Sequence, residues 1–276
     1  MRRVSALSIC SFCFLVYSEG FTGILSRDAV AQCRLPLFAT RDQSSLTFRC
    51  DIQYTSEVLP ECGKEEAAAF LFRPETRDLL LSAGGSRLVK EVLVTPEIKG
   101  MWVEACQRYY SQEDFPEKGD KVMVVGTEIK FPGLKLMIKA LSGVKAYSTD
   151  DGLYIYKFYS IAEKQQVEGA LPVVWLFNQI TGAKDKPNGF GPSNAWSKTC
   201  VSIVELGAGT AYNFDCTFEI KMQFPATLLR LLPASKEMVE EQSSITIRNT
   251  LFKDIVKAVD ASHKAFSQRC DSTLKV

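Results

Sequence analysis

Histidine is almost absent from this sequence of 276 residues, which contains only His263. Metal sites with several histidine ligands are therefore excluded, and a serine–histidine–aspartate triad would depend on this one residue. His263 follows Val259 by four positions and precedes Phe266 by three. This spacing predicts a partly buried or capping histidine at the edge of an apolar helix face.

An excess of charge of one sign is also lacking. The chain has 33 lysines and arginines, 32 acidic residues and a formal net charge of +1. No basic stripe runs along it, which argues against nucleic acid as a partner. The acidic pairs Glu240/Glu241 and Asp150/Asp151 fall where a helix start and a turn explain them, so we assign no catalytic residues.

Phosphate-binding glycine motifs and further long apolar runs are missing as well. Gly84-Gly85 and Gly207-Ala208-Gly209 lack the spacing of a phosphate loop and are typical of turns. The apolar stretch from Ala170 to Ile180 has about half of the roughly 20 residues that a membrane-spanning helix needs.

Cysteine pairs of the zinc and thioredoxin type do not occur beyond the amino terminus. Of the nine cysteines, Cys10 and Cys13 lie in the first 20 residues, and no Cys-x-x-Cys pair follows them. If Gly207-Ala208-Gly209 is a three-residue hairpin loop, Cys200 lies directly opposite Cys216. We favour free thiols packed as small apolar residues, with a disulfide as the alternative, and assign no metal site.

The sequence begins with the features of an export signal. Arg2 and Arg3 precede an apolar stretch from Val4 to Tyr17, and small side chains occupy the positions three and one before a cut after Gly20. The apolar stretch is too short to span a membrane. We predict that residues 1–20 are a cleavable signal peptide.

The next segment, residues 21–45, has the composition of a weak transit peptide, with three arginines, two acidic residues and five hydroxyl residues. An export signal cut just before Phe21 and followed by such a segment resembles the two-part presequence of algae with secondary, red-lineage plastids. The resemblance implies a plastid (chloroplast) protein. The alternative is a secreted or endoplasmic-reticulum protein with a flexible amino-terminal segment.

One domain is predicted over residues 76–270, after a linker over residues 46–75 that is mixed and polar. Helical character over residues 67–81 is interrupted by Pro74.

A strand is expected over residues 87–94, followed by a helix that Thr95 caps and Pro96 opens. Strand-like segments then follow, separated by turns: 120–131, 134–147, with a possible break at Gly143, 153–167, 197–206 and 210–224. In the last segment, apolar residues from Tyr212 to Phe224 alternate with polar ones. A period of two over thirteen residues predicts a long antiparallel strand with one solvent-exposed face.

The carboxyl end changes to helical spacing, which predicts one long helix from Ser235 to about Phe266. Its buried face is expected to carry Met238, Ile245, Phe252, Ile255, Val256, Val259 and Phe266. The whole order gives an α+β fold, a curved antiparallel β-sheet wrapped around a long C-terminal α-helix.

This order of elements is similar to the helix-grip fold of the START and polyketide-cyclase superfamily, in which sheet and helix enclose an apolar cavity. The stretch from Phe218 to Val239, with Phe224-Pro225 and Leu232-Pro233, resembles the closing signature of a cyanobacterial and plastid family catalogued as domain of unknown function 1997. Glu241-Gln242 departs from that family's pattern, in which a glycine is commoner. The family has no established activity or cofactor, and the resemblance agrees with a plastid location.

The resemblance implies a cavity for a hydrophobic plastid ligand such as a lipid, an isoprenoid or a tetrapyrrole. We expect its lining on the inward face of the last strand and on the last helix: Tyr212, Phe214, Phe218, Gln242, Asn249 and Phe252. Buried amides require hydrogen-bond partners, which a ligand head group can supply. The alternative is that these residues belong to a filled core or contact the strand backbone.

A second hypothesis concerns Leu171 to Phe177 and the loop 181–193. With Trp175, Phe177 and Trp196, these segments can form a lid over the cavity mouth or a patch on a membrane surface. The alternative is a segment packed in the core.

Three functions remain open at this point. The first is a non-catalytic carrier or sensor for a hydrophobic small molecule. The second is a structural or assembly factor that contacts the thylakoid membrane surface or a membrane protein. The third is a cyclase-type enzyme, which needs polar residues that converge inside the cavity.

Overall fold

The computed structural model describes residues 43–60, 62–131, 134–150, 152–171, 174, 189–207, 209–225 and 235–273. The predicted signal peptide and residues 21–42 of the transit-like segment lie outside the described residues, and so do Trp175 and Phe177 of the proposed lid.

The core of the fold is one antiparallel sheet with the strand order β1-β8-β7-β6-β5-β4-β3, and β2 pairs with β8 beyond the end of β1. Its strands are β1 (Gln43–Thr55), β2 (Leu59–Pro60), β3 (Leu88–Val92), β4 (Lys121–Phe131), β5 (Leu134–Ser148), β6 (Tyr154–Gly169), β7 (Ala195–Leu206) and β8 (Gly209–Pro225).

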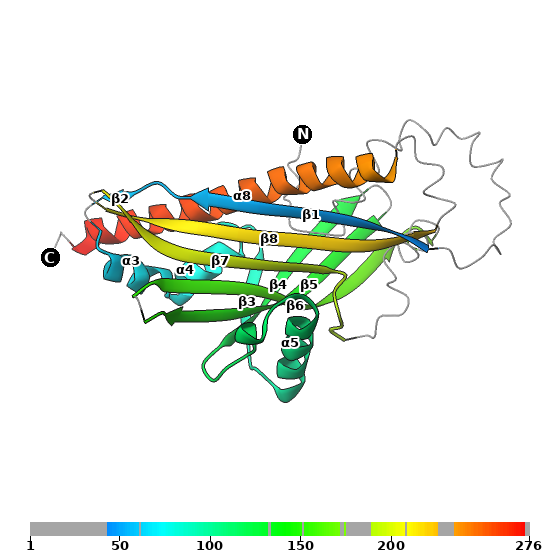
Figure 1. Ribbon diagram of the computed structural model, residues 1–276, viewed down its shortest axis with the longest axis horizontal. Coiled ribbons are helices and arrows are strands. Elements are labelled where there is room, and N and C mark those ends of the chain that lie inside the picture. Colours follow the sequence, from blue (N-terminus) through cyan, green and yellow to red (C-terminus); the bar gives the residue numbers. More distant parts are fainter. Residues whose placement is uncertain are drawn as a thin grey trace, which may run out of the picture.

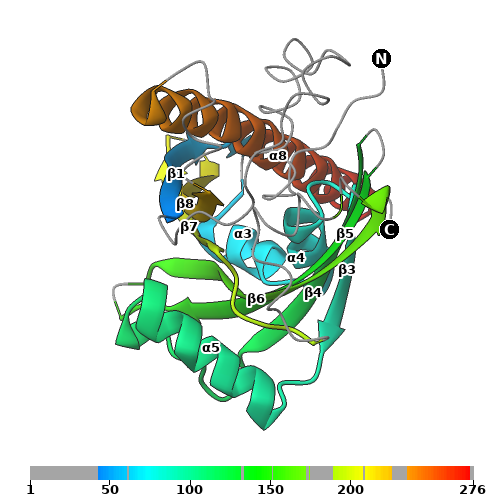
Figure 2. The same ribbon diagram turned by 90° about the vertical axis from the view of Figure 1, so that its right-hand side faces the viewer.

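Helices cover both faces of this sheet: α3 (Lys64–Leu71), α4 (Pro74–Leu81), α5 (Pro96–Tyr109), the short 3₁₀ helix η1 (Gln112–Asp114) and α8 (Lys236–Thr273). Strands β1, β8 and β7 run lengthwise beside α8 (Figure 1), and the sheet curves around α3 and α4 (Figure 2). Figure 2 shows α3, α4 and α8 on the concave side and α5 on the convex side. The predicted architecture, a curved antiparallel sheet around a long C-terminal helix, is therefore confirmed, and it is a helix-grip fold.

Helix α5 begins as predicted and packs on the convex face. The Thr95 hydroxyl accepts a hydrogen bond from the backbone N–H of Ile98 at 3.3 Å, with Pro96 in the first turn. Trp102 of α5 is fully buried over Gly143 of β5, where a Cβ atom would lie 2.5 Å from the indole ring. Strand β5 runs through Gly143 without the predicted break, because the missing side chain makes room for Trp102.

The prediction of a linker over residues 46–75 is wrong. Strand β1 starts at Gln43, pairs with β8 along its whole length, and buries Leu46, Phe48, Cys50 and Ile52 on the concave side. Helices α3 and α4 follow it, so the folded domain begins at Gln43 and not at position 76. Strand β8 needs a second neighbour for its backbone groups, and β1 provides it.

The outer edge of β1 is covered by α8. The backbone N–H of Thr47 donates to the Glu240 carboxylate at 2.7 Å, and that of Arg49 donates to the Ser244 hydroxyl at 3.2 Å. These side chains satisfy edge amides that would otherwise be open to pairing with another chain.

Helix α8 is confirmed, but its predicted buried face is wrong over the first half of the helix, whereas Val259 and Phe266 are buried as predicted. Met238, Ile245 and Phe252 are exposed by 54%, 46% and 42%, and Gln242 and Asn249 are exposed as well. The buried positions are Ser243, Ile247, Leu251, Asp254, Ala258, Val259, Ser262 and Phe266. Two of the buried polar side chains have partners inside: Arg87 donates to Asp254, and the Ser262 hydroxyl donates to the Ala258 carbonyl of the same helix at 2.9 Å.

The alternation predicted for β8 is confirmed, since Tyr212 and every second residue to Met222 are buried. The register predicted for the cysteines is wrong. Leu206 pairs with Gly209, so Cys200 lies opposite Asp215 and Cys216 opposite Thr199. A shift of one residue places the two thiols on different faces. Cys200 and Cys216 are free thiols, as we favoured, and burial raises the pKa of Cys50 to about 12.

Candidate ligand cavity

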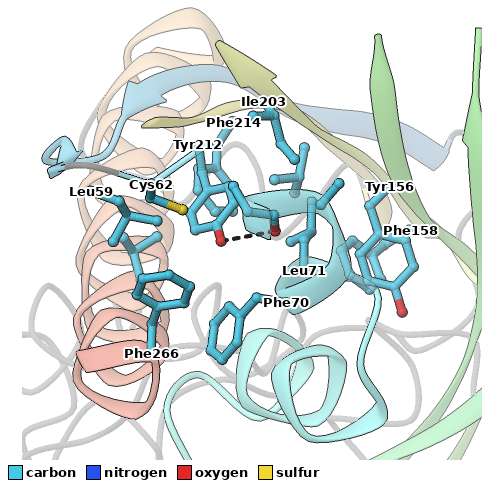
Figure 3. Close-up of a cluster of buried hydrophobic side chains, with 14 of the residues drawn as sticks. Leu59, Cys62, Phe70, Leu71, Tyr156, Phe158, Ile203, Tyr212, Phe214 and Phe266 are labelled. Atoms are coloured by element: carbon cyan, nitrogen blue, oxygen red, sulfur yellow. Dashed lines mark hydrogen bonds between the residues drawn. The ribbon is translucent and has the colours of Figure 1, made fainter. Parts of the chain in front are cut away.

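Two apolar clusters fill the two ends of the space between the sheet and α8. The first contains Phe158, Phe214 and the carboxyl-terminal half of α8 with Val259 and Phe266. The second contains Phe218 and the amino-terminal half of α8 with Ile247 and Leu251. Figure 3 shows the first cluster, in which the Tyr212 hydroxyl donates to the Ala67 carbonyl at 3.2 Å.

A cavity of about 200 Å³ lies where the two clusters meet. Phe214 and Phe218 of β8, Leu251 and Ala258 of α8 and Leu141 of β5 contribute to its apolar wall.

The sheet wall of the cavity carries a group of hydroxyl side chains: Thr127 of β4, Ser142 of β5, Ser160 of β6, and Ser197 and Thr199 of β7. Ser142 pairs directly with Ser160, next to the bulge between β5 and β6. A filled apolar core does not need hydroxyl groups at inward positions of a sheet. Here these hydroxyl groups can form hydrogen bonds with polar atoms of a ligand in the cavity.

An ion pair closes the helix side of the cavity. An Arg87 guanidinium nitrogen donates to the Asp254 carboxylate at 2.5 Å, and the two side chains are 6% and 12% exposed. Burial lowers the pKa of Arg87 below its ordinary value, and the charge and hydrogen bond of Asp254 act against that. Both residues line the cavity.

The turn between α4 and β3 determines where Arg87 lies. Ala83, Gly84 and Gly85 all have positive φ, and the Ser82 hydroxyl accepts a hydrogen bond from the Gly85 N–H at 2.8 Å. A Cβ atom on Gly84 would lie 3.0 Å from the Lys257 carbonyl oxygen, so this turn packs closely on α8. The close approach places Arg87 beside Asp254.

A buried carboxylate, Glu163 of β6, also lines the cavity and is 7% exposed. The Gln165 side chain donates to it at 2.7 Å, and backbone hydrogen bonds join residue 163 to Gly191. This contact holds Ser193, another lining residue, close to the cavity.

A second hollow, of about 600 Å³, lies near α4 and the loop before β4. Its buried cations are already paired. Lys145 donates to the Phe115 carbonyl at 2.8 Å and to Glu117 at 2.7 Å, and Arg77 donates to Glu91 at 2.8 Å. These contacts connect loops to the sheet, so we place the candidate site in the smaller, more apolar cavity.

The predicted site residues separate into three groups. Phe214 and Phe218 line the cavity, as expected. Tyr212 lies in the filled cluster beside it (Figure 3). The predictions for Gln242, Asn249 and Phe252 are wrong, because these side chains are exposed, and Phe252 packs edge-on against Tyr54 with ring centroids 5.6 Å apart.

Trp196 does not belong to a lid over this cavity. It stacks on Tyr109 of α5, with ring centroids 5.9 Å apart, and so lies on the convex face. The residues that the sequence reasoning missed are Arg87, Asp254 and the hydroxyl group of the sheet wall. A signal for Asp254 does exist, since it continues the helical spacing of Ile247, Leu251 and Ala258.

The convex face carries its own buried charge, Asp114 of η1, whose side chain is 1% exposed. Lys198 and Tyr159 donate to it at 2.7 and 2.6 Å, and the Ser111 hydroxyl donates at 3.0 Å. Burial on its own would raise the pKa of Asp114, but these donors outweigh it and hold the pKa well below its ordinary value.

His263 is half-buried on α8, 6.2 Å from the Tyr212 ring, and burial lowers its pKa. It is not among the lining residues of the cavity. In the part of the chain that the structure describes, no group of three His, Cys, Asp or Glu side chains could hold a metal ion. None of the described helices is long and apolar enough to cross a membrane.

Comparisons with known proteins add little to this geometry. No family model and no curated protein matches the chain. Among solved structures, a norcoclaurine synthase point mutant from Thalictrum flavum in complex with a transition-state analogue is similar at 8% identity, over 78% of this chain and 98% of that chain, with a TM-score of 0.27. The Mll3558 protein from Rhizobium loti is similar at 12% identity, over 78% and 99% of the two chains, with a TM-score of 0.28.

Proposed function

We propose that this protein binds a small, mostly apolar molecule in the cavity between its sheet and α8. The observation that carries the proposal is a cavity of about 200 Å³ whose wall combines apolar side chains with hydroxyl groups and an ion pair. Sites of this kind, apolar with a few placed polar groups, are typical of small-molecule binding.

The volume narrows the ligand class. A dry cavity of about 150 Å³ holds benzene, whereas drug-sized ligands occupy roughly 300–1,000 Å³. A cavity of about 200 Å³ therefore fits a molecule with about ten non-hydrogen atoms, such as a monocyclic isoprenoid. A tetrapyrrole or a diacyl lipid is too large to lie entirely within it.

The polar groups support binding rather than catalysis. Arg87 and Asp254 contact each other, and Glu163 accepts a hydrogen bond from Gln165. A general base that is already paired inside the protein is poorly placed to take a proton from a ligand.

Native mass spectrometry combined with organic extraction of the purified protein tests this proposal. We expect a small apolar molecule to be released from the wild type. Ala258→Leu places a larger side chain at the cavity wall and should reduce the amount of ligand, whereas Thr246→Leu, outside the cavity on the same helix, should not. Equal recovery from both variants, or none from the wild type, contradicts the proposal.

We also propose a plastid location, which is supported by the predicted export signal, by Phe21 and by the arginine-bearing composition of residues 21–45. In an alga with secondary plastids, the full chain fused to a fluorescent protein should reach the plastid. Phe21→Ala should stop it before the inner envelopes, while Phe21→Tyr, which keeps the ring, should not. Secretion of the wild-type fusion contradicts the proposal.

One observation favours the alternative of a surface-acting assembly factor. Met238, Ile245 and Phe252 are exposed on α8 at intervals of seven residues, which lines them up along one side of the helix. If the extraction recovers no ligand and replacing these three residues by serine abolishes function in the cell, the assembly role replaces ligand binding.

A further inference from the structure

We propose that the Arg87–Asp254 pair is the head-group site of the cavity, and that it selects apolar molecules with an uncharged hydrogen-bond acceptor, such as a ketone. Hydrocarbons of the same shape and carboxylates are then bound less tightly. The inference rests on the proposed function and names the ligand class for the same cavity.

Arg87 has more hydrogen-bond donors than its contact with Asp254 uses. A guanidinium carries five N–H groups, and it accepts no hydrogen bonds itself. In the described part of the chain, the acceptor that it contacts is Asp254, through one nitrogen at 2.5 Å. Its side chain is 6% exposed and lines the cavity, so the remaining donors are in reach of a ligand.

An uncharged acceptor suits this pair better than a carboxylate. Asp254 already neutralises the charge of Arg87, so a ligand carboxylate would enter a low-dielectric cavity without a free counter-charge and close to a like charge. A carbonyl oxygen accepts from the guanidinium without that penalty. A hydrocarbon leaves the remaining donors unpaired once it has displaced water from the cavity.

The donor is held in place before a ligand arrives. The turn over Ala83 and Gly84 packs against Lys257 and Ala261 of α8, and Ala83 itself lines the cavity. A fixed donor loses little conformational freedom on binding, which favours selection between ligands of the same shape.

Three molecules with one six-membered-ring skeleton provide the test: limonene, a hydrocarbon, carvone, its ketone, and perillate, a carboxylate. Affinities are measured by isothermal titration with the full mature chain. For the wild type we expect carvone to bind about tenfold more tightly than limonene, the ratio typical of one hydrogen bond to a charged group, and perillate to bind most weakly.

Two variants assign the selection to the pair. Arg87→Met combined with Asp254→Leu removes both charges and should bring the carvone-to-limonene ratio close to one while limonene still binds. Asp254→Asn leaves Arg87 without a counter-charge, so perillate should become the tightest of the three. Arg49→Met, on the exposed face of β1, is the matched control and should keep the wild-type order.

Each outcome separates the two proposals. Equal binding of limonene and carvone by the wild type overturns the head-group inference and leaves ligand binding intact. Absence of binding by all three molecules overturns the proposed function as well. A carvone preference that survives in the double variant, or perillate as the tightest ligand of the wild type, also overturns the inference. If the double variant does not fold, the change of order in Asp254→Asn decides.

Discussion

Two buried carboxylates lie on opposite faces of the sheet and are held in different ways. Asp114, under α5 on the convex face, receives hydrogen bonds from Lys198, Tyr159 and Ser111. Asp254, on the concave face, contacts Arg87 beside a cavity of about 200 Å³. The first carboxylate is surrounded by donors, and the second belongs to a pair whose cation keeps donors in reach of the cavity.

The difference indicates two roles for buried charge. A carboxylate whose oxygens are all engaged joins parts of the chain that are far apart in sequence, and removing it leaves several donors without an acceptor. A pair at the wall of a cavity contributes less to stability, because water or a ligand can replace part of what is lost. Asp114 is therefore expected to act on folding and Asp254 on ligand choice.

The largest effect is expected for Asp114→Ala. It leaves the Tyr159 hydroxyl buried without its acceptor and frees Lys198, which is one-third exposed, so we expect a loss of about 3 kcal/mol in the free energy of unfolding. Urea denaturation measures the change. Asp215→Ala, an exposed carboxylate of β8, is the control. A loss below about 1 kcal/mol would contradict the expectation that the carboxylate on the convex face contributes more to stability than the one on the concave face.

Gly143→Ala tests the packing of the convex face alone. The added methyl group would lie 2.5 Å from the Trp102 ring, so the indole or the strand must move. We expect a loss of about 2 kcal/mol, typical of overpacking, with unchanged ligand selectivity. Gly100→Ala, in α5 with open space around it, is the control and should be neutral or stabilising. A changed carvone-to-limonene ratio in Gly143→Ala would contradict the separation of the two faces.

The contribution of Asp114 to the stability of the folded protein should decrease at acidic pH. Its pKa is lower in the folded state than in the unfolded chain, where aspartate titrates near 3.9, so its contribution is present above about pH 4 and is lost as the pH falls below it. We expect the stability difference between the wild type and Asp114→Asn to shrink by about 1 kcal/mol between roughly pH 5 and pH 3. A constant difference across that range contradicts the assignment.

The smallest effect is expected from replacing the concave pair. Arg87→Met with Asp254→Leu should change the free energy of unfolding by less than about 1 kcal/mol, because apolar residues of similar volume replace a buried ion pair with little loss. Asp254→Ala alone should cost more than the double variant, since it leaves Arg87 buried without its partner. Thermal unfolding of the three proteins measures both differences, and a double variant less stable than the single one contradicts the comparison.

Much of the fold was predictable because its signals are local. The alternation from Tyr212 to Phe224 and the cap at Thr95 depend on neighbouring residues, and both are confirmed in the described residues. Strand β1 carried the same kind of signal, with Leu46, Phe48 and Cys50 at every second position. It was missed because the stretch follows a leader-like segment and its polar half resembles a linker.

The candidate site was predicted only in part because its residues are selected by contacts between distant segments. The apolar heptad spacing of Met238, Ile245 and Phe252 predicted a buried face, yet the sheet contacts a face that contains Asp254. Arg87, 167 residues earlier in the chain, pairs with Asp254 and so offsets the free-energy cost of burying its charge. The offset of Cys200 from Cys216 likewise depends on a connection one residue shorter than expected.

The α+β class, the long last helix and the strand periods follow from the order of residues, because hydrophobic periodicity is a property of neighbouring residues. The buried face of the first half of α8, the pairing of β1 with β8 and the cavity with its ion pair between two filled clusters follow from contacts between distant segments. These features depend on how the curved sheet meets the helix, and no local pattern in the chain records that geometry.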